Sequence, residues 1–353
     1  MIIFISVLIL GFLVVIHELG HFFAAKKAGV LVEEFGVGFP PRLFSFKKGE
    51  TVYSLNALPL GGFVKIYGET EEFKDNPRSF SSKSIGVRTG IVFAGVFMNF
   101  VIGMFLLIVS YGIGFPSPVS NENKAFIQNQ SLVIARVLSN SPGMNAGLKD
   151  GDVIVSLNNE KVDASAFREF VALHKGDAIT VAVKRGGEEK SFSVQTRKEY
   201  PQNECSVGIA LADQGMLRYP FHLALIHGVR DSFIIVGKIV DAFAGLLYGV
   251  LHGSVDRDSV SGPVGVFVLA GHAIQSGIQY VLPLIILITF NLAVMNVLPL
   301  PALDGGRIFF FILEKLKGGP ISSRVENAIH GTGFLFLIIL MIFLTVGDIK
   351  RFF

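Results

Sequence analysis

Two histidines and a glutamate lie together near the start of the chain, in the sequence HELGH at residues 17–21. His17 and His21 are four positions apart, so on a helix they project from one face and can bind a single metal ion. Glu18 lies between them, where a carboxylate can act as general base on a metal-activated water. Residues 2–16 carry no charge. Charged and metal-binding side chains at membrane depth are costly, so the motif predicts a zinc hydrolase that works inside the bilayer.

A third ligand is needed, because hydrolytic zinc sites use three protein ligands and keep one position for water. The chain has one cysteine, Cys205, so a cysteine-based zinc site is excluded. We expect the third ligand to be Asp304, in the sequence NVLPLPALDGG at residues 296–306. Its prolines and glycines break the helix, and broken backbone at membrane depth is tolerated where it is buried or lines a wet cavity. Alternatively, Asp304 only ends a helix at the membrane border. The favoured set, His17, His21 and Asp304, holds one zinc ion.

Three asparagines lie in otherwise apolar stretches: Asn99, Asn291 and Asn296. They could bind substrate backbone or stabilise an oxyanion. The alternative is hydrogen bonding between helices, which is common for asparagine in membranes. We favour a functional role for Asn296, eight residues before Asp304, and leave both readings open for Asn291 and Asn99. The remaining six histidines, His330 among them, have no spacing that indicates a site, and we expect them at the surface or the membrane interface.

The composition indicates a membrane protein with some soluble mass. The 353 residues are 51% hydrophobic and 17% charged, below the quarter that is typical of soluble domains. The mean hydropathy is +0.57. The net charge is only +3, and no basic stripe with interleaved aromatics is present, so a nucleic-acid partner is not expected.

Four apolar segments are long enough to cross a bilayer, which takes about 20 residues. They cover residues 1–25, 90–115, 280–300 and 331–346. A cleaved signal peptide is disfavoured, because HELGH would be discarded with it. The loop at residues 26–89 carries ten lysines and arginines, which predicts a cytoplasmic loop with both chain ends outside. Lys350 and Arg351 argue mildly against that orientation.

Within this loop, residues 51–67 (TVYSLNALPLGGFVKIY) read as two short β segments joined by a Pro-Leu-Gly-Gly turn. Such a hairpin, next to the HELGH helix, could offer a free strand edge to an extended peptide. A purely structural hairpin is an equal alternative. Residues 1–115 thus form the first predicted region, with two membrane helices and a membrane-associated β-hairpin.

The sequence pattern of residues 120–200 is typical of a soluble α+β domain. Residues 131–137, 178–183 and 191–194 look like strands, and residues 163–174 look like a helix. The order Ala-Gly-Leu, Gly-Asp, a strand and then Asn-Asn-Glu-Lys-Val resembles PDZ domains in the circularly permuted bacterial arrangement. We find one such module, on the side of the membrane opposite the cationic loop.

Residues 219–258 are apolar but carry polar side chains at spacings of three, four and seven. That pattern favours an amphipathic helix lying along the membrane surface, with a fifth membrane span as the alternative. Residues 259–353 then hold the last two membrane helices. The expected fold is an α-helical integral membrane protein with about four transmembrane helices, a cytoplasm-side β-hairpin and one inserted PDZ-like domain.

Taken together, HELGH, NxxPxPxLDGG at residues 296–306, PLGGFVK at residues 59–65 and the PDZ-like insert resemble the site-2 proteases, which are intramembrane zinc metalloproteases. The resemblance covers essentially the whole chain and is strongest to the bacterial regulator of sigma-E protease. It implies that His17, His21 and Asp304 bind zinc and that Glu18 is catalytic. It further implies that Asn291 and Asn296 assist substrate handling and that the PLGGFVK element, with Gly61, Gly62 and Phe63, pairs with substrate.

Two departures limit this transfer. Better-known relatives carry two PDZ modules, so a size-filter role is less secure here. Val96 follows Ala94-Gly95 where the family often has proline, which weakens transfer to Asn99.

The resemblance implies an inner-membrane endopeptidase that cuts transmembrane segments of single-span proteins already trimmed by another protease. An anti-sigma factor or remnant signal peptides are the expected substrates. Two other readings are a peptide-binding membrane scaffold with a structural metal and a metal transporter. The intact Glu18 disfavours the scaffold, and the single ligand cluster disfavours the transporter.

Overall fold

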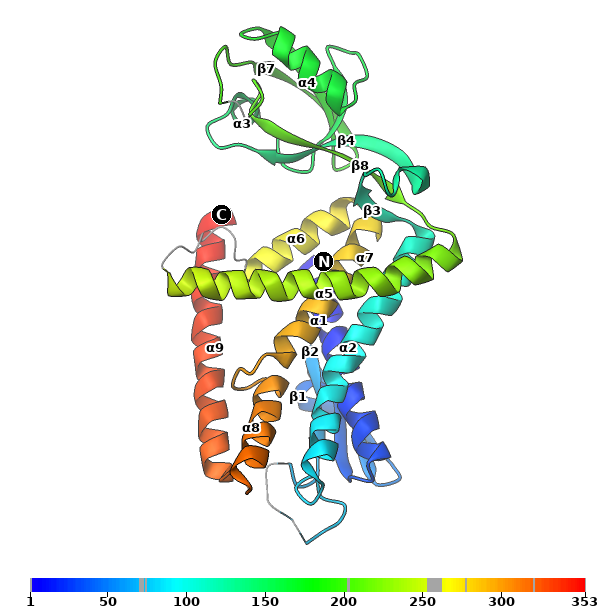
Figure 1. Ribbon diagram of the computed structural model, residues 1–353, viewed down its shortest axis with the longest axis vertical. Coiled ribbons are helices and arrows are strands. Elements are labelled where there is room, and N and C mark those ends of the chain that lie inside the picture. Colours follow the sequence, from blue (N-terminus) through cyan, green and yellow to red (C-terminus); the bar gives the residue numbers. More distant parts are fainter. Residues whose placement is uncertain are drawn as a thin grey trace. The chain divides into compact units, whose positions relative to one another are not determined.

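The computed structural model describes residues 2–69, 73, 75–201, 204–252, 262–276, 278–319 and 321–352. These form two compact units, the first comprising residues 1–108, 227–274 and 284–353 and the second residues 109–226 and 275–283. Figure 1 shows the helices and strands in chain order: α1 (Ile2–Lys27), β1 (Val32–Lys48), β2 (Thr51–Ile66), α2 (Ile85–Ile113), β3 (Phe115–Pro118), the 3-10 turn η1 (Lys124–Phe126), β4 (Ile127–Val137), α3 (Pro142–Ala146), β5 (Val153–Leu157), α4 (Ala164–Leu173), β6 (Ala178–Arg185), β7 (Glu188–Gln195), β8 (Ile209–Leu217), α5 (Phe221–Leu251), α6 (Pro263–Ser276), α7 (Ile278–Val297), α8 (Asp304–Lys317) and α9 (Ser323–Phe352).

Five described helices are long and apolar enough to cross a membrane: α1, α2, α5, α7 and α9. Four of them coincide with the predicted spans. In the most apolar stretch of α9 no residue is buried inside the protein, as expected of a helix that faces lipid. Two further helices of the first unit, α6 and α8, have 14 residues each and are too short to span.

The helix predicted to lie along the membrane surface is α5. It packs on α2, where Gly228 lies against Ile108 and the rings of Phe100 and Phe233 have centroids 5.1 Å apart. In Figure 1, α5 runs crosswise to α2 and α9. Its length and composition would allow it to span, so the surface helix and the fifth membrane span both stay predictions.

The predicted hairpin at residues 51–67 is wrong in its pairing. Its two halves do not pair with each other, because residues 32–37 of β1 lie between them and pair with residues 52–55 on one side and 62–66 on the other. Residues 42–48 complete the sheet by pairing with residues 51–56. Prolines at 40, 41 and 59 lack the N–H that a ladder needs, so both strands bend there. Each bent strand therefore contributes two arms.

One apolar core joins the elements that surround HELGH. It contains side chains of α1, β1, β2, α2 and α8 and of the loop before α2. Its buried residues are Phe22, Ala25, Val30, Val32, Phe35, Ile66, Phe80, Ile91, Val92 and Phe311. The sheet and α8 are thereby packed against α1, which carries HELGH, and against α2.

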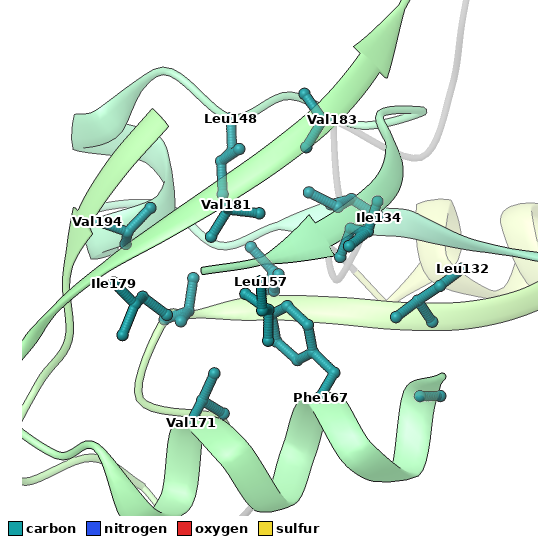
Figure 2. Packing of buried hydrophobic residues seen from close by; sticks show 14 residues of the cluster. Leu132, Ile134, Leu148, Leu157, Phe167, Val171, Ile179, Val181, Val183 and Val194 are labelled. Atoms are coloured by element: carbon teal, nitrogen blue, oxygen red, sulfur yellow. The ribbon is translucent and has the colours of Figure 1, made fainter. Parts of the chain in front are cut away.

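The second unit is an α+β module, as predicted. Its sheet has the strand order β3-β8-β4-β5-β6-β7, with antiparallel pairing throughout. Phe167 and Val171 of α4 pack onto the sheet, where Leu157 and Val181 are fully buried (Figure 2). Asp163 caps α4 by accepting a hydrogen bond from the N–H of Ala166, as its position before the helix predicts. β8 was not predicted from the sequence, because the predicted domain ended at residue 200 and β8 lies beyond it.

Candidate metal centre

His17 and His21 lie on the buried face of α1, where α2 approaches very closely. A Cβ at Gly95 would be 2.5 Å from ring atoms of His21 and 2.8 Å from Cε1 of His17. A Cβ at Gly20 would be 2.3 Å from the carbonyl oxygen of Ala94. Only glycine fits at both positions, so two glycines set how close the second helix comes to the histidines.

Asp304 is delivered by the broken segment between α7 and α8. Ala302 adopts a left-handed φ of +72°, and its N–H donates a hydrogen bond to Nδ1 of His330, 2.8 Å away. A Cβ at Gly305 would be 2.1 Å from the carbonyl oxygen of Val297, so the start of α8 is pressed against the end of α7. The turn is therefore held from two sides. His330, expected at the surface or the membrane interface, is half-buried against this turn.

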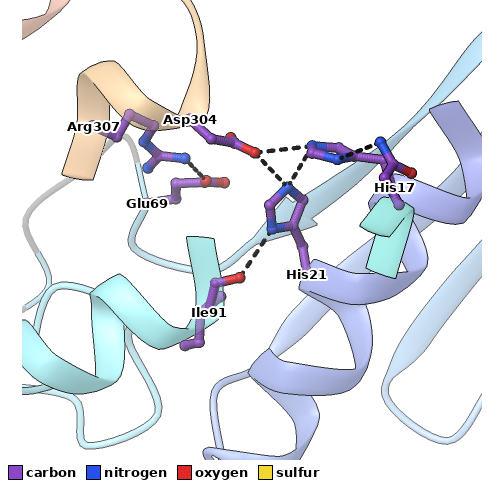
Figure 3. Close-up of polar contacts among 7 residues, drawn as sticks. His17, His21, Glu69, Ile91, Asp304 and Arg307 are labelled. Carbon is purple, nitrogen blue, oxygen red and sulfur yellow. Dashed lines mark hydrogen bonds and ion pairs between the residues drawn. The ribbon is translucent and has the colours of Figure 1, made fainter. Parts of the chain in front are cut away.

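Three ligand atoms converge at this point (Figure 3). Oδ2 of Asp304 lies 2.9 Å from Nε2 of His17 and 3.3 Å from Nε2 of His21, and the two nitrogens are 3.1 Å apart. Ligand atoms about 2.0–2.1 Å from a tetrahedral zinc ion are separated by about 3.3 Å. Among the described residues, these three are the one group of histidine, cysteine and acidic side chains close enough to share an ion.

The proton positions on the rings also fit a cation. Nδ1 of His21 lies 3.0 Å from the carbonyl oxygen of Ile91, which can only accept, so Nδ1 carries the proton and Nε2 presents a lone pair. Nδ1 of His17 lies 3.3 Å from the side-chain amide of the fully buried Asn99. The atom placed at that distance is Nδ2, while Oδ1 of Asn99 is left without a partner. Exchanging the two ends of the amide puts Oδ1 on the ring and gives that oxygen a partner, and His17 then donates in the same way. Two lone pairs and a carboxylate oxygen then face one another, an arrangement that a cation stabilises.

The charge of Asp304 suits the same role. Its Oδ2 is buried, makes no ordinary hydrogen bond and lies within 3.3 Å of Nε2 of both histidines. A carboxylate oxygen directed at two ring nitrogens that present lone pairs supplies the negative charge that a bound cation needs.

The other predicted site residues lie at different distances from this centre. Glu18 is half-buried on α1 beside His17. Gly61 and Gly62 of β2 lie against Val14 and Val15, within one helical turn before His17.

Phe63 is farther along β2, where its ring stacks on Phe39 with centroids 6.4 Å apart. Asn296 is half-buried in the last turn of α7. Asn291 donates to the carbonyl oxygen of Leu287 in its own helix, at 2.9 Å.

Two features next to the centre were not predicted from the sequence. Arg307, one turn after Asp304, forms an ion pair with Glu69 from the loop that follows β2 (Figure 3). Gly95 and Asn99 are four apart on α2 and so share one helix face, a spacing that could have indicated their joint contact with the histidines.

The described helices and this buried cluster define a class: a helical membrane protein with a candidate metal centre of two histidines and one aspartate. Residues 5–340 match peptidase family M50. A putative zinc metalloprotease of Clostridium perfringens is 34% identical and is covered over 95% of its length by 96% of this chain. Zinc metalloprotease RasP of Geobacillus kaustophilus is 29% identical, with 98% of this chain and 97% of that relative covered.

The chain belongs to peptidase family M50, the site-2 proteases. This confirms the predicted resemblance and the predicted zinc cofactor. The protein is a multi-pass membrane protein and a zinc metalloprotease, in a family that acts on membrane-embedded substrates. The scaffold and transporter readings are set aside.

Proposed function

We propose that the protein hydrolyses peptide bonds within the transmembrane segments of single-span membrane proteins. The observation that carries this proposal is that His17 and His21, on a helix apolar and long enough to span, converge with Asp304 at the start of α8. These three residues would hold the zinc ion, and zinc bound there would supply the Lewis acidity that activates water and polarises the scissile carbonyl.

Glu18 is the catalytic base in this proposal. Its position between the two ligands on α1 supports transfer of a proton from the attacking water to its carboxylate. The protonated Glu18 then gives that proton to the nitrogen of the leaving amine. The carboxylate is regenerated and both new chain ends are released.

The sheet beside α1 supports a way to present the substrate. A peptide carbonyl within a helix is hydrogen-bonded and shielded, so the scissile segment has to unwind. Residues 62–66 pair with residues 32–37 on one side, and the described strands put no partner on the other. An extended segment added to that edge would run beside α1, near Gly61 and Gly62. We assign Phe63 to the same edge, and Asn291 and Asn296 to contacts with the substrate backbone.

The proposed location is a bacterial inner membrane, with the metal centre near the cytoplasmic side and the PDZ-like unit outside. The cationic loop at residues 26–89 supports this orientation. Substrates would be an anti-sigma factor or remnant signal peptides, trimmed first by another protease. The PDZ-like unit would then screen what approaches from outside.

The test compares the wild type with Glu18→Gln in detergent or vesicles, measuring zinc content and cleavage of a single-span reporter together. We expect zinc to remain bound and cleavage to be lost. Persistent cleavage with zinc bound would refute the assigned base. A reporter that keeps its full extracytoplasmic domain should be cut more slowly than a trimmed one, and equal rates would contradict the screening role.

A further inference from the structure

The position of α8 matters because its first residue is the proposed ligand Asp304. Two ion pairs tie this helix to the loop before α2 and to the start of α2. Arg307 pairs with Glu69, and Nη2 of Arg88 lies 2.5 Å from Oε2 of Glu314. The side chain of Glu314 is only 9% exposed and that of Arg88 16%. Both pairs join segments more than 200 residues apart in the chain.

Two phenylalanine rings lie between these pairs. Phe80 of the loop and Phe311 of α8 are each 3% exposed, with ring centroids 6.2 Å apart. The guanidinium of Arg307 is 5.6 Å from the centroid of Phe80, and that of Arg88 is 4.7 Å from that of Phe311. Each guanidinium therefore has a carboxylate and an aromatic face as partners. We name this set the two-arginine cluster: Glu69, Phe80, Arg88, Arg307, Phe311 and Glu314.

The cluster and the ligand share one face of α8. Positions 304, 307, 311 and 314 fall within about 80° of arc on a helix of 3.6 residues per turn. Rotating α8 to bring Asp304 away from the histidines would also carry Arg307 away from Glu69. Arg307 lies one turn from Asp304, whereas Glu314 lies almost three turns away. Of the two ion pairs, that of Arg307 therefore constrains the position of the Asp304 carboxylate more directly.

We propose that Arg307 is a positioning residue for the metal centre, whose ion pair with Glu69 fixes the rotation of α8 so that Asp304 faces His17 and His21. This inference rests on the proposed ligand set. Glu69 lies three residues after the end of β2, so the pair also links the sheet to the helix that carries the ligand.

The test uses the full-length protein in detergent, with zinc affinity measured by competition against a chelator. Arg307→Met removes the guanidinium and its charge but keeps an unbranched side chain, and Glu69→Gln is the milder change at the other end. We expect each to lower zinc affinity roughly 10-fold or more, the range for residues that orient metal ligands. At saturating zinc, kcat should fall while KM stays close to the wild-type value, because the substrate is held elsewhere.

Rescue separates positioning from general destabilisation. The swap Glu69→Arg with Arg307→Glu should recover much of the zinc affinity lost in the single variants. The matched control is Arg78→Met. Arg78 lies in the same loop as Glu69, but its partner is Glu50 of the turn between β1 and β2 and not a residue of α8. It should leave zinc affinity unchanged.

Wild-type zinc affinity in a folded Arg307→Met or Glu69→Gln would overturn the proposal, as would a folded swap variant that recovers none. Melting temperatures identify the folded variants. If the wild type binds zinc but cuts no reporter, the proposed function fails while the zinc comparison still decides the role of Arg307.

Discussion

At the residue scale, the metal centre depends on which nitrogen of each histidine carries a proton. The carbonyl oxygen of Ile91 sets this for His21 and the amide of Asn99 sets it for His17. Either ring turned to the other tautomer would present an N–H to the ion instead of a lone pair. Asn99 thus makes a hydrogen bond between α2 and α1, as one of the two interpretations expected, and its partner there is a proposed zinc ligand.

Asn99→Leu should lower zinc affinity by roughly 10- to 100-fold, because His17 loses the acceptor that orients it. Asn99→Asp keeps an acceptor and should stay much closer to the wild type. Thr289→Val is the control, since Thr289 is also fully buried and polar but bonds to Ile285 of its own helix. Equal zinc affinity for Asn99→Leu and Thr289→Val would contradict the assigned role.

Gly95→Ala should abolish tight zinc binding, because the added Cβ would lie 2.5 Å from the ring of His21. Gly90→Ala on the same helix has nothing within 4 Å of the added atom and should bind zinc normally. Alanine is the better helix former, so Gly90→Ala should melt no lower than the wild type. Zinc content and melting temperature of the two purified variants give the comparison, and normal zinc in Gly95→Ala would rule the steric argument out.

At the element scale, the turn between β1 and β2 is tied to α1 and to the loop before α2 by a single carboxylate. Oε1 of Glu50 accepts from Lys26 at 3.0 Å and Oε2 accepts from Arg78 at 2.5 Å. The hydrogen bond from Arg78, followed by that from Lys26, lowers the pKa of Glu50 to about 2. The sheet is thus fastened at its turn as well as along its buried arms.

This shift predicts a pH dependence with a definite sign. Since the folded pKa lies below the ordinary value of about 4.3, the stabilisation by Glu50 is complete above that value and is lost as the pH falls toward 2. Carboxyl NMR of the full-length protein should place the Glu50 midpoint near 2, and Arg78→Met should move it up toward 4.3. An unchanged midpoint in that variant would remove Arg78 as the cause.

Elements whose signals are local were predictable from the sequence. The spans follow from runs of apolar residues, and α4 follows from its periodicity and from Asp163 at its start. The order of the paired segments of β1 and β2 could not be predicted, because it depends on pairing between segments that are distant in the sequence. Apolar residues such as Leu43 and Phe44 also remain exposed, so their pattern does not mark a buried face. At the candidate metal centre, the spacing within HELGH was enough to predict His17, Glu18 and His21. The contacts of Arg307 and His330 join segments that no short pattern relates.

At the scale of the whole molecule, the chain divides between a unit that holds the metal centre and an α+β unit with its own core. In the second unit, Asp152 is 1% exposed and accepts two hydrogen bonds from Arg185, at 2.6 and 2.7 Å. The hydrogen bond to Asp152 raises the pKa of Arg185, so the guanidinium stays charged. A buried carboxylate of this kind depends on its partner.

Arg185→Met should destabilise the second unit by roughly 3–5 kcal/mol, because it leaves the charge of Asp152 buried and unpaired. Lys190→Met removes the exposed pair with Glu188 and should cost at most about 1 kcal/mol. Hydrogen exchange of β5 and β6 amides in the full-length protein measures both changes. Zinc affinity should be the same in both variants, and a loss confined to Arg185→Met would show that the two units do not fold independently.

The proposed ligands come from the two ends of the chain, since Asp304 lies 283 positions after His21. Translation at about 5–20 residues per second separates their synthesis by roughly 15–60 s. During that interval a nascent chain already has its first helix in the membrane but lacks the third ligand. With the proposed ligand set, the metal centre is therefore incomplete until residue 304 has been synthesised.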